Sequence, residues 1–220
     1  MSSILILQAH PNPTSFVAAL AQHYQQGAQS AGATVTCIDV STLQFDLVLR
    51  GGFTSPMPDE PDLARVRKAI ADAEHVVWMF PTWWVGLPAA LKGLIDRLFL
   101  PGQAFVYEGG PLPRGLMAGR SARYITTMDS PRLWYWLAHR RAIAASFGRG
   151  TLRFVGFSPV RGTLLFNVRK MTARRRAAWL HKLEQLGQRD AVKLLRPKAL
   201  RVAAPKPHNA GNVAGNVIRD

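Results

Sequence analysis

The segment of residues 75–99 reads His75-Val-Val-Trp-Met-Phe80, then Pro81-Thr-Trp-Trp-Val-Gly-Leu-Pro88, then Ala89-Ala-Leu-Lys-Gly-Leu-Ile-Asp-Arg-Leu-Phe99. Its first part is a continuous apolar run, which is typical of a strand buried on both faces of a parallel sheet. In its last part apolar residues recur at helical spacing, and Pro88 stands where a first helical turn tolerates proline. We therefore expect a buried strand, a loop and an amphipathic helix, in that order.

The same alternation of strand and helix continues on both sides of this segment. Strands are expected at 4–7, 35–40, 75–80, 121–127 and 155–165, and helices at about 16–31, 61–73, 88–99, 133–147 and 172–186. Strands that alternate with helices at this spacing imply right-handed crossovers between parallel strands. The expected fold class is therefore α/β, with a doubly wound parallel sheet.

Composition excludes several other classes of protein. The chain has 220 residues, of which 48% are apolar, and a single cysteine, Cys37. This apolar content argues against a disordered chain, and one cysteine cannot form an internal disulfide, so we expect Cys37 to be a small buried hydrophobe. The most apolar stretch, 76–91, is broken by prolines and is shorter than the ~20 residues of a membrane span. No signal peptide is recognisable, and these features together predict a cytoplasmic protein.

Charge is distributed very unevenly along the chain. The net charge is +15, but residues 1–113 sum to −3 and residues 114–220 to +18. A surplus of this kind suits a solvated basic face, a pocket for a phosphorylated cofactor, a membrane surface or nucleic acid. Residues 191–220 have little periodicity and no aromatic side chain, so we expect a basic tail after a domain of residues 1–190, with no specific binding of nucleic acid.

Three loops with unusual content are expected at the carboxyl ends of the strands, where ligands of such sheets bind: 8–16, 81–87 and 126–131. The first leads into a helix N-terminus, which can bind phosphate, although helix capping by Thr14 or Ser15 explains its composition equally well. The second holds two adjacent tryptophans, which suit a flat heterocycle. The third offers hydroxyls, or simply a helix cap at Asp129 or Ser130. Neither a P-loop nor a G-x-G-x-x-G turn is present.

Taken together, these motifs resemble the flavodoxin-like NAD(P)H:quinone oxidoreductases, the family of DT-diaphorase, bacterial quinone reductases and ancillary flavoproteins of potassium-efflux systems. The long motif at 80–99 is the most specific, and four shorter ones follow the family's order: His10 with Thr14-Ser-Phe16, Phe105-Val-Tyr107, Thr126-Thr127 and Phe154-Val-Gly-Phe157. The resemblance implies a flavodoxin-like three-layer α/β/α fold with a five-stranded parallel sheet of order 2-1-3-4-5.

The resemblance also implies a flavin site and a substrate site. The flavin phosphate would be held by His10, Thr14, Ser15, Phe16 and Val17. The isoalloxazine would be held by Pro81, Thr82, Trp83, Trp84, Val85 and Gly86. Its pyrimidine side would be held by Thr126, Thr127, Met128 and Asp129. Phe105, Val106 and Tyr107 would flank the substrate. Many members have Gly-Gly where this chain has Met128-Asp129, and that is a departure from the family pattern.

The activity implied is transfer of a hydride from NAD(P)H to the flavin, then two-electron reduction of a quinone-like acceptor by a homodimer without a metal. FMN is favoured as the cofactor and FAD stays open. Tyr135 and His139 are the candidate donors to the flavin, although their spacing differs from the family's. Arg132, Arg140 and Arg141 could contact the NAD(P)H phosphates or form a solvated helix face.

Two alternatives remain from other functional classes. A flavodoxin-type electron carrier would need no NAD(P)H site. A regulatory or ancillary flavoprotein subunit would act through a partner or a membrane surface, with the basic tail as the contact. The strongly basic surface and the extra loop at 101–120 weigh against the carrier.

Overall fold

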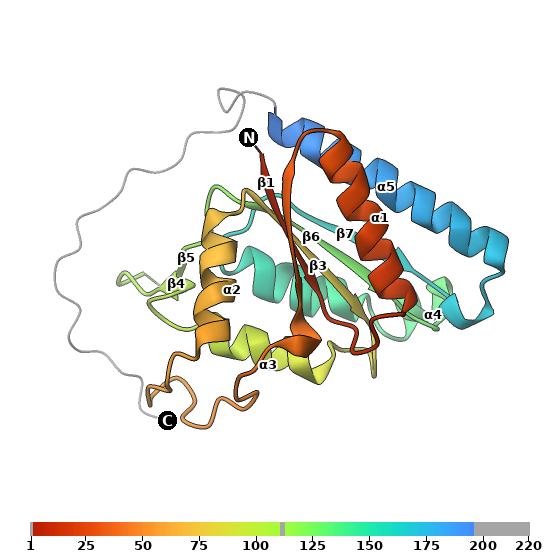
Figure 1. The fold of residues 1–220 in the computed structure, drawn as a ribbon. Helices are drawn as coiled ribbons and strands as arrows, with labels where there is room; N and C mark the ends of the chain where they lie inside the picture. Colours follow the sequence, from red (N-terminus) through yellow and green to blue (C-terminus); the bar gives the residue numbers. More distant parts are fainter. Residues whose placement is uncertain (1, 111–112, 196–220) are drawn as a thin grey trace.

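The computed structural model describes residues 2–110 and 113–195 and is built around one parallel sheet (Figure 1). Its five strands lie in the order β2-β1-β3-β6-β7, and every neighbouring pair is parallel. They are β1 (Ser3–Gln8), β2 (Thr34–Asp39), β3 (His75–Pro81), β6 (Ser121–Thr127) and β7 (Val160–Leu165). The predicted order 2-1-3-4-5 is confirmed, since β6 and β7 are the fourth and fifth strands of this sheet.

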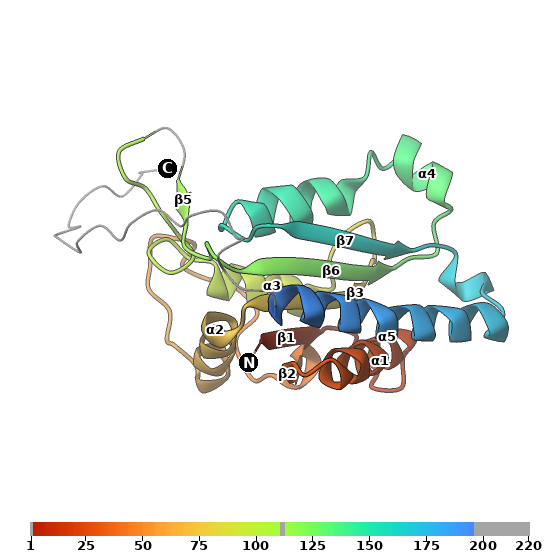
Figure 2. The ribbon, with the colours of Figure 1, turned by 90° about the horizontal axis from the view of Figure 1, so that it is seen from above.

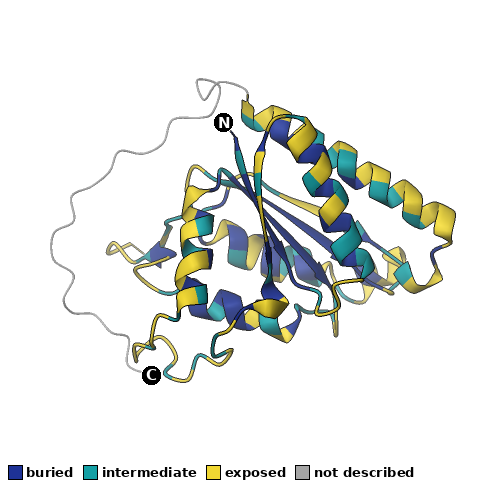
Figure 3. Ribbon diagram, in the orientation of Figure 1, coloured by how far each residue is buried: buried dark blue, intermediate teal, exposed yellow. Residues whose placement is uncertain are grey.

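Helices cover both faces of the sheet and form the outer two layers (Figures 1 and 2). One face is covered by α1 (Phe16–Ser30) and α5 (Ala173–Leu195). The other is covered by α2 (Pro61–Asp72), α3 (Ala89–Leu98) and the π-helical segment η2 (Ala144–Arg153). The buried residues accordingly fall into two clusters, one on each side of the strands, as the dark strands between partly exposed helices show (Figure 3).

The central strand β3 explains why its sequence is apolar at every position. Val76, Trp78 and Phe80 face the α2–α3–η2 layer, whereas Val77 and Met79 face the α1–α5 layer. All seven residues of the strand are buried. A strand with helices on both sides cannot alternate polar and apolar residues without burying polar groups.

Smaller elements complete the fold. The helix α4 (Arg132–Leu137) follows β6, and two short 3-10 helices occupy Val40–Thr42 (η1) and Val168–Lys170 (η3). An antiparallel pair, β4 (Phe105–Val106) and β5 (Arg114–Gly115), lies near the amino ends of the sheet strands, at the opposite end of the molecule from α4 (Figure 2).

Two predicted boundaries in the second half of the chain are wrong. The helix expected at 133–147 is divided into α4 and η2, because Arg140 and Arg141 take left-handed φ angles of 44° and 59° and reverse the chain. The strand expected at 155–165 begins only at Val160. Helical backbone persists to Phe154, and Gly156, at a φ of 104°, then turns the chain.

Two further expectations are corrected or extended. The last helix runs to Leu195 instead of Leu186, because Asp190 and Ala191 stay buried as it follows α1. Cys37 is exposed, since β2 is an edge strand whose outer positions face solvent.

Residues 196–220 of the expected basic tail lie outside the described residues, so the division of the chain at 190 stays a prediction. Among the described helices, none combines the length and the apolar character that a membrane span requires.

Candidate functional site

The three loops predicted at the carboxyl ends of the strands meet at one edge of the sheet. The rings of His10 and Trp83, from the first two loops, lie edge to face with centroids 5.8 Å apart. The second and third loops are joined by a backbone bond, in which the amide of Thr82 donates to the carbonyl of Thr127 at 2.7 Å. The hydroxyls of Thr82 and Thr126 also lie 2.7 Å apart. The structure therefore brings together residues separated by more than a hundred positions.

The first loop is held in shape by Asn12. Its Oδ1 accepts from the amide of Thr14 at 2.9 Å and from the Thr14 hydroxyl at 2.7 Å. Ser15 caps α1, since its Oγ accepts from the amide of Ala18 at 3.2 Å. The amides of Phe16 and Val17, in the first helical turn, have no intrahelical acceptor, and the helix dipole adds positive potential there. The capping role of Ser15 is therefore confirmed, and anion binding by this loop stays a prediction.

The ring of His10 faces this loop in its neutral form. Partial burial lowers the pKa of His10. Its Nδ1 accepts from the amide of Asn12 at 3.0 Å, a bond that needs an unprotonated nitrogen. The remaining proton therefore lies on Nε2, where the ring can donate to an acceptor at the sheet edge.

The tryptophan loop is a tight turn with backbone strain. The amide of Gly86 donates to the carbonyl of Trp83 at 2.8 Å, and the reverse bond is 3.2 Å long. The two residues between them, Trp84 and Val85, have φ angles of 50° and 60°. Bulky side chains rarely adopt these angles, and each costs about 1–3 kcal/mol. Trp84 is fully exposed at the tip.

The third loop is fixed by its neighbours instead of lying open. Met128 is buried, its amide donates to the carbonyl of Leu165 at 2.9 Å, and its carbonyl accepts from Val168 at 3.2 Å. Asp129 Oδ1 accepts from the amide of Arg169 at 2.7 Å. Met128 and Asp129 thus tie this loop to the end of β7 and to the segment that follows it. Thr126 and Thr127 are buried beside the sheet edge.

The two candidate donors lie on or just after α4, in different surroundings. Tyr135 is 2% exposed, packs against Phe166 at 5.6 Å between centroids, and its hydroxyl makes no hydrogen bond of normal geometry with the described residues. Burial raises the pKa of Tyr135, and the facing backbone amides of Ala144 and Ile143 oppose this. His139 is partly exposed and contacts Trp134 edge to face at 6.2 Å.

The predicted substrate residues do not lie beside the three loops. Phe105 and Val106 form β4, and the ring of Phe105 contacts Tyr107 and Phe154 at 5.7 and 5.1 Å between centroids. An apolar groove of about 620 Å³, here called the α3 groove, connects Phe105 and Tyr107 to Gly86 and Leu87 of the tryptophan loop along α3. The helix α3, whose ten residues span about 15 Å, separates Phe105 and Tyr107 from that loop along the groove.

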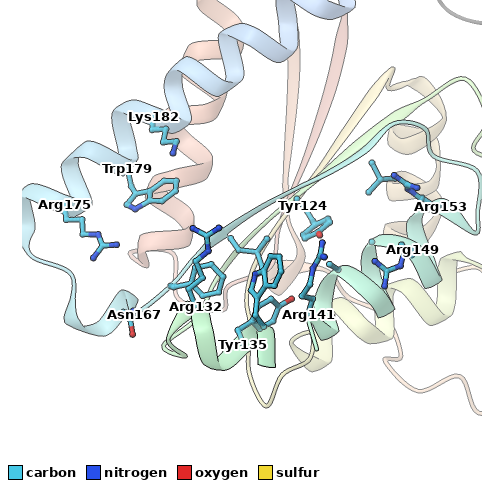
Figure 4. Close-up of a pocket in the computed structure, with 17 residues that line it drawn as sticks. Tyr124, Arg132, Tyr135, Arg141, Arg149, Arg153, Asn167, Arg175, Trp179 and Lys182 are labelled. Atoms are coloured by element: carbon cyan, nitrogen blue, oxygen red, sulfur yellow. The ribbon is translucent and has the colours of Figure 1, made fainter. Parts of the chain in front are cut away.

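A second cavity escaped the sequence analysis. It measures about 800 Å³ and is lined by α4, η2, β7 and α5, with Arg132 and Arg141 but not Arg140 at its wall (Figure 4). We call it the basic cavity. The signal was present in α5, where Arg175, Trp179 and Lys182 recur at the spacing of one helical face.

The fold and the three-loop edge define a flavodoxin-like protein. The family model described as "Flavodoxin-like fold" matches residues 2–188, and the chain therefore belongs to that family.

Individual relatives specify the family further and confirm the predicted resemblance. NAD(P)H dehydrogenase (quinone) 1 of Cavia porcellus is 26% identical over 188 residues, covering 74% of this chain and 68% of the relative. An uncharacterized NAD(P)H oxidoreductase of Haemophilus influenzae is 25% identical over 200 residues, covering 88% of this chain and 98% of the relative. Among solved structures, Smu.1420 from Streptococcus mutans UA159 is 31% identical and has a TM-score of 0.74. The match covers 85% of this chain and 99% of the Smu.1420 chain.

Proposed function

We propose that this protein is a flavin-dependent NAD(P)H:quinone oxidoreductase that holds its flavin at the carboxyl edge of β1, β3 and β6. The observation that carries the proposal is the meeting of three loops at this edge, linked through His10 to Trp83 and through Thr82 to Thr126 and Thr127. The activities that the names of the relatives print, NAD(P)H oxidation and quinone reduction, support the same reading.

The residues present fit a flavin phosphate at the start of α1. The backbone amides of Phe16 and Val17 and the Nε2–H group of His10 can donate hydrogen bonds to a phosphate. A lysine is not required, because helix N-termini bind phosphate through their free backbone amides. A single phosphate matches this small set of donors, which is why we favour FMN over FAD.

The other two loops fit the flat ring system. The tryptophan loop supplies its turn backbone and the face of Trp83, and the paired threonines supply buried hydroxyls that can be donors or acceptors. A bound flavin would supply the hydride chemistry, accepting two electrons from NAD(P)H and passing them to the acceptor. The chain itself would position the ring, exclude water with Trp83, and fix the protonation of His10.

A homodimer would place Phe105 and Tyr107 where the resemblance assigns them. In one chain they lie at the far end of the α3 groove from the three loops, so a second copy would have to bring them to the substrate. The groove is apolar, and Phe53 and Tyr107 at its wall are more than half exposed. An apolar surface of this kind supports association between two copies. A cytoplasmic location remains a prediction of the sequence.

The experiment that tests this function is an absorption spectrum of the purified protein, followed by anaerobic addition of NADPH and then of menadione. We expect flavin bands that bleach with NADPH and recover with menadione, and repetition with NADH gives the coenzyme preference. Heat release of the cofactor separates FMN from FAD. A flavin that neither nicotinamide reduces would support the carrier or the ancillary-subunit alternative. Failure to bind flavin after reconstitution would refute the proposal.

A further inference from the structure

Helix α4 projects from the carboxyl end of the sheet with most of its side chains in solvent (Figures 1 and 2). It has one buried side chain, that of Tyr135, which packs against Phe166. Its four other large apolar side chains are between 51% and 70% exposed, and they are Leu133, Trp134, Trp136 and Leu137. Adjacent apolar side chains of this size are seldom left in water unless a partner covers them. The outward face of α4 is therefore a candidate docking surface.

The exposed side chains of α4 fall into two sets. Trp136 lines the basic cavity, and the guanidinium carbon of Arg141 lies 4.8 Å from the centroid of its ring. Leu133, Trp134 and Leu137 do not line that cavity, and we call these three side chains the α4 tip. None of the three is assigned to the flavin, the nicotinamide coenzyme or the substrate. The α4 tip therefore has no role in the proposed reaction that would explain its exposure.

The chain around α4 carries positive charge only. Residues 130–183 include twelve lysines and arginines and no aspartate or glutamate. None of these twelve cations forms an ion pair within the part of the chain that the structure describes. Elsewhere, by contrast, exposed arginines such as Arg50 and Arg114 pair with carboxylates. A partner that matches this region has to be anionic.

Several of these cations lie at the same end of the molecule as the α4 tip. The amide of Arg169 donates to Asp129 Oδ1 at 2.7 Å, which fixes η3 beside the loop that leads into α4. The side chains of Arg169 and Lys170 are exposed, and so is that of Arg174 at the start of α5. Both ribbon views place α4 and the start of α5 at one end of the molecule (Figures 1 and 2). Exposed apolar side chains and exposed cations are therefore presented together.

The combination of leucine, tryptophan and basic residues is typical of segments that lie in a membrane interface. Apolar side chains enter the boundary between headgroups and acyl chains, tryptophan rings lie at headgroup level, and cations contact lipid phosphates. A protein partner would need a surface of roughly 800 Å² from roughly 20 residues a side, and a six-residue helix offers much less. A nucleic acid strand would use the cations but leave Leu133 and Leu137 in water.

We propose that the α4 tip and the cations around it dock onto an anionic lipid surface. Leu133, Trp134 and Leu137 would enter the boundary between headgroups and acyl chains, while the exposed cations of η3 and α5 contact the lipid phosphates. Because α4 follows the carboxyl end of β6, docking brings that edge of the sheet next to the lipid. The contact requires neither bound flavin nor the proposed reductase activity, so its failure and theirs can be told apart.

The test is flotation of the full chain with lipid vesicles at about 0.15 M salt. One set of vesicles contains equal parts of phosphatidylglycerol and phosphatidylcholine, and the other contains phosphatidylcholine alone. We expect binding to the anionic vesicles and little binding to the neutral ones. Tryptophan emission should shift to shorter wavelength on binding, because Trp134 leaves water, and Trp134→Phe should reduce this shift. Raising the salt to about 0.5 M should weaken binding, because it screens the cations.

Matched variants locate the contact on the molecule. Leu133→Ser and Leu137→Ser should each weaken vesicle binding about tenfold, since each removes an apolar side chain that the lipid would bury. Val48→Ser is their control, an exposed aliphatic residue outside α4. Arg174→Gln should weaken binding about fivefold, and Arg189→Gln, near the other end of α5, should leave it unchanged. Thermal unfolding of each variant verifies that it folds.

Four results would overturn the proposal. The first is absence of binding to the anionic vesicles, and the second is equal binding to the neutral ones. Unchanged binding of both leucine variants would assign the contact to another part of the chain, such as the basic tail. Sedimentation of the leucine variants provides the fourth, because conversion of a dimer into monomers would show that the α4 tip contacts a second copy of the chain instead of lipid.

Discussion

Asp190 on α5 accepts two hydrogen bonds from Arg123 on β6 in the interior of the protein, at 2.6 Å to Oδ2 and 2.9 Å to Oδ1. The hydroxyl of Tyr24 on α1 donates to the same carboxylate at 2.9 Å, and His75 Nε2 on β3 lies 3.7 Å away. Asp190 is 3% exposed. The Asp190 carboxylate therefore links α1 and α5, the two helices on one face of the sheet, to strands β3 and β6.

We predict that Asp190→Asn destabilises the fold by about 3–5 kcal/mol, because it leaves the charge of Arg123 buried without a partner. Burial alone would raise the pKa of Asp190, but the facing His75 and Arg123 hold it well below its usual range. The carboxylate therefore stabilises the fold fully above the unfolded pKa of about 3.9, and this contribution is lost as the pH falls below that value. Urea unfolding at several pH values should show a weaker acid dependence in the variant.

The control for this prediction is Arg189→Gln, an exposed charge one residue away on the same helix. It should change the free energy of unfolding by less than about 0.5 kcal/mol. If Asp190→Asn were as stable as this control, the pair would not be part of the support of the fold.

The second prediction separates the aromatic side chain of the tryptophan loop from its strained backbone. Trp84→Gly should raise the free energy of unfolding by about 1 kcal/mol, since glycine accepts a φ of 50° without steric cost. If the loop lies against the flavin as proposed, the same change should weaken flavin binding. Denaturant unfolding of the flavin-free chain and fluorescence titration with FMN measure the two effects.

Val85→Gly is the matched comparison, because Val85 has a φ of 60° and no aromatic ring. It should stabilise the flavin-free chain to a similar extent and leave the affinity for FMN nearly intact. Equal loss of flavin binding in both variants would mean that loop rigidity matters and the Trp84 ring does not.

Most of the fold could be predicted because its signals are local. The run at 75–80 is apolar at every position since β3 is buried on both faces, and Pro61 and Pro88 mark helix starts. The prediction failed where tertiary packing decides. Nothing in the local pattern at residues 133–147 indicates that Arg140 and Arg141 take left-handed angles, which let Tyr135 and Phe147 both be buried from separate helices.

For the site, the sequence predicted which loops meet but not how they are fixed. The loops 81–87 and 126–131 were both expected at the carboxyl ends of the strands, and the hydroxyls of Thr82 and Thr126 lie in contact there. The locking of Asp129 by the amide of Arg169 depends on a loop 40 residues away. The basic cavity was missed because its cations come from α4, η2, α5 and the turn at Arg141, which are far apart in the sequence, and the cations of η2 and α5 each have the pattern of a solvated helix face.

The third prediction concerns the contact between α1 and α5. A Cβ atom added at Gly187 would lie 2.1 Å from the carbonyl oxygen of Tyr24, which is backbone and cannot rotate away. Gly187→Ala should therefore destabilise the fold by about 1–3 kcal/mol, despite the higher helix propensity of alanine. Gln185→Ala, exposed on the same helix, serves as the control in thermal unfolding. A stable Gly187→Ala variant would show that the two helices can separate without cost.

The last prediction asks whether the buried hydroxyl of Tyr135 serves chemistry or only packing. The Tyr135 hydroxyl makes no hydrogen bond of normal geometry within the described residues, so Tyr135→Phe should change the melting temperature little. If the hydroxyl donates to the flavin as proposed, anaerobic reduction by NADPH should slow about 10- to 100-fold with flavin affinity nearly unchanged. Because the pKa of Tyr135 is raised, the donor stays protonated and its contribution should persist through pH 9. Tyr124→Phe is the control, a second buried tyrosine from β6 that lines the same cavity. Equal rates in Tyr135→Phe and the unmodified protein would remove Tyr135 from the reaction and leave His139 as the candidate donor.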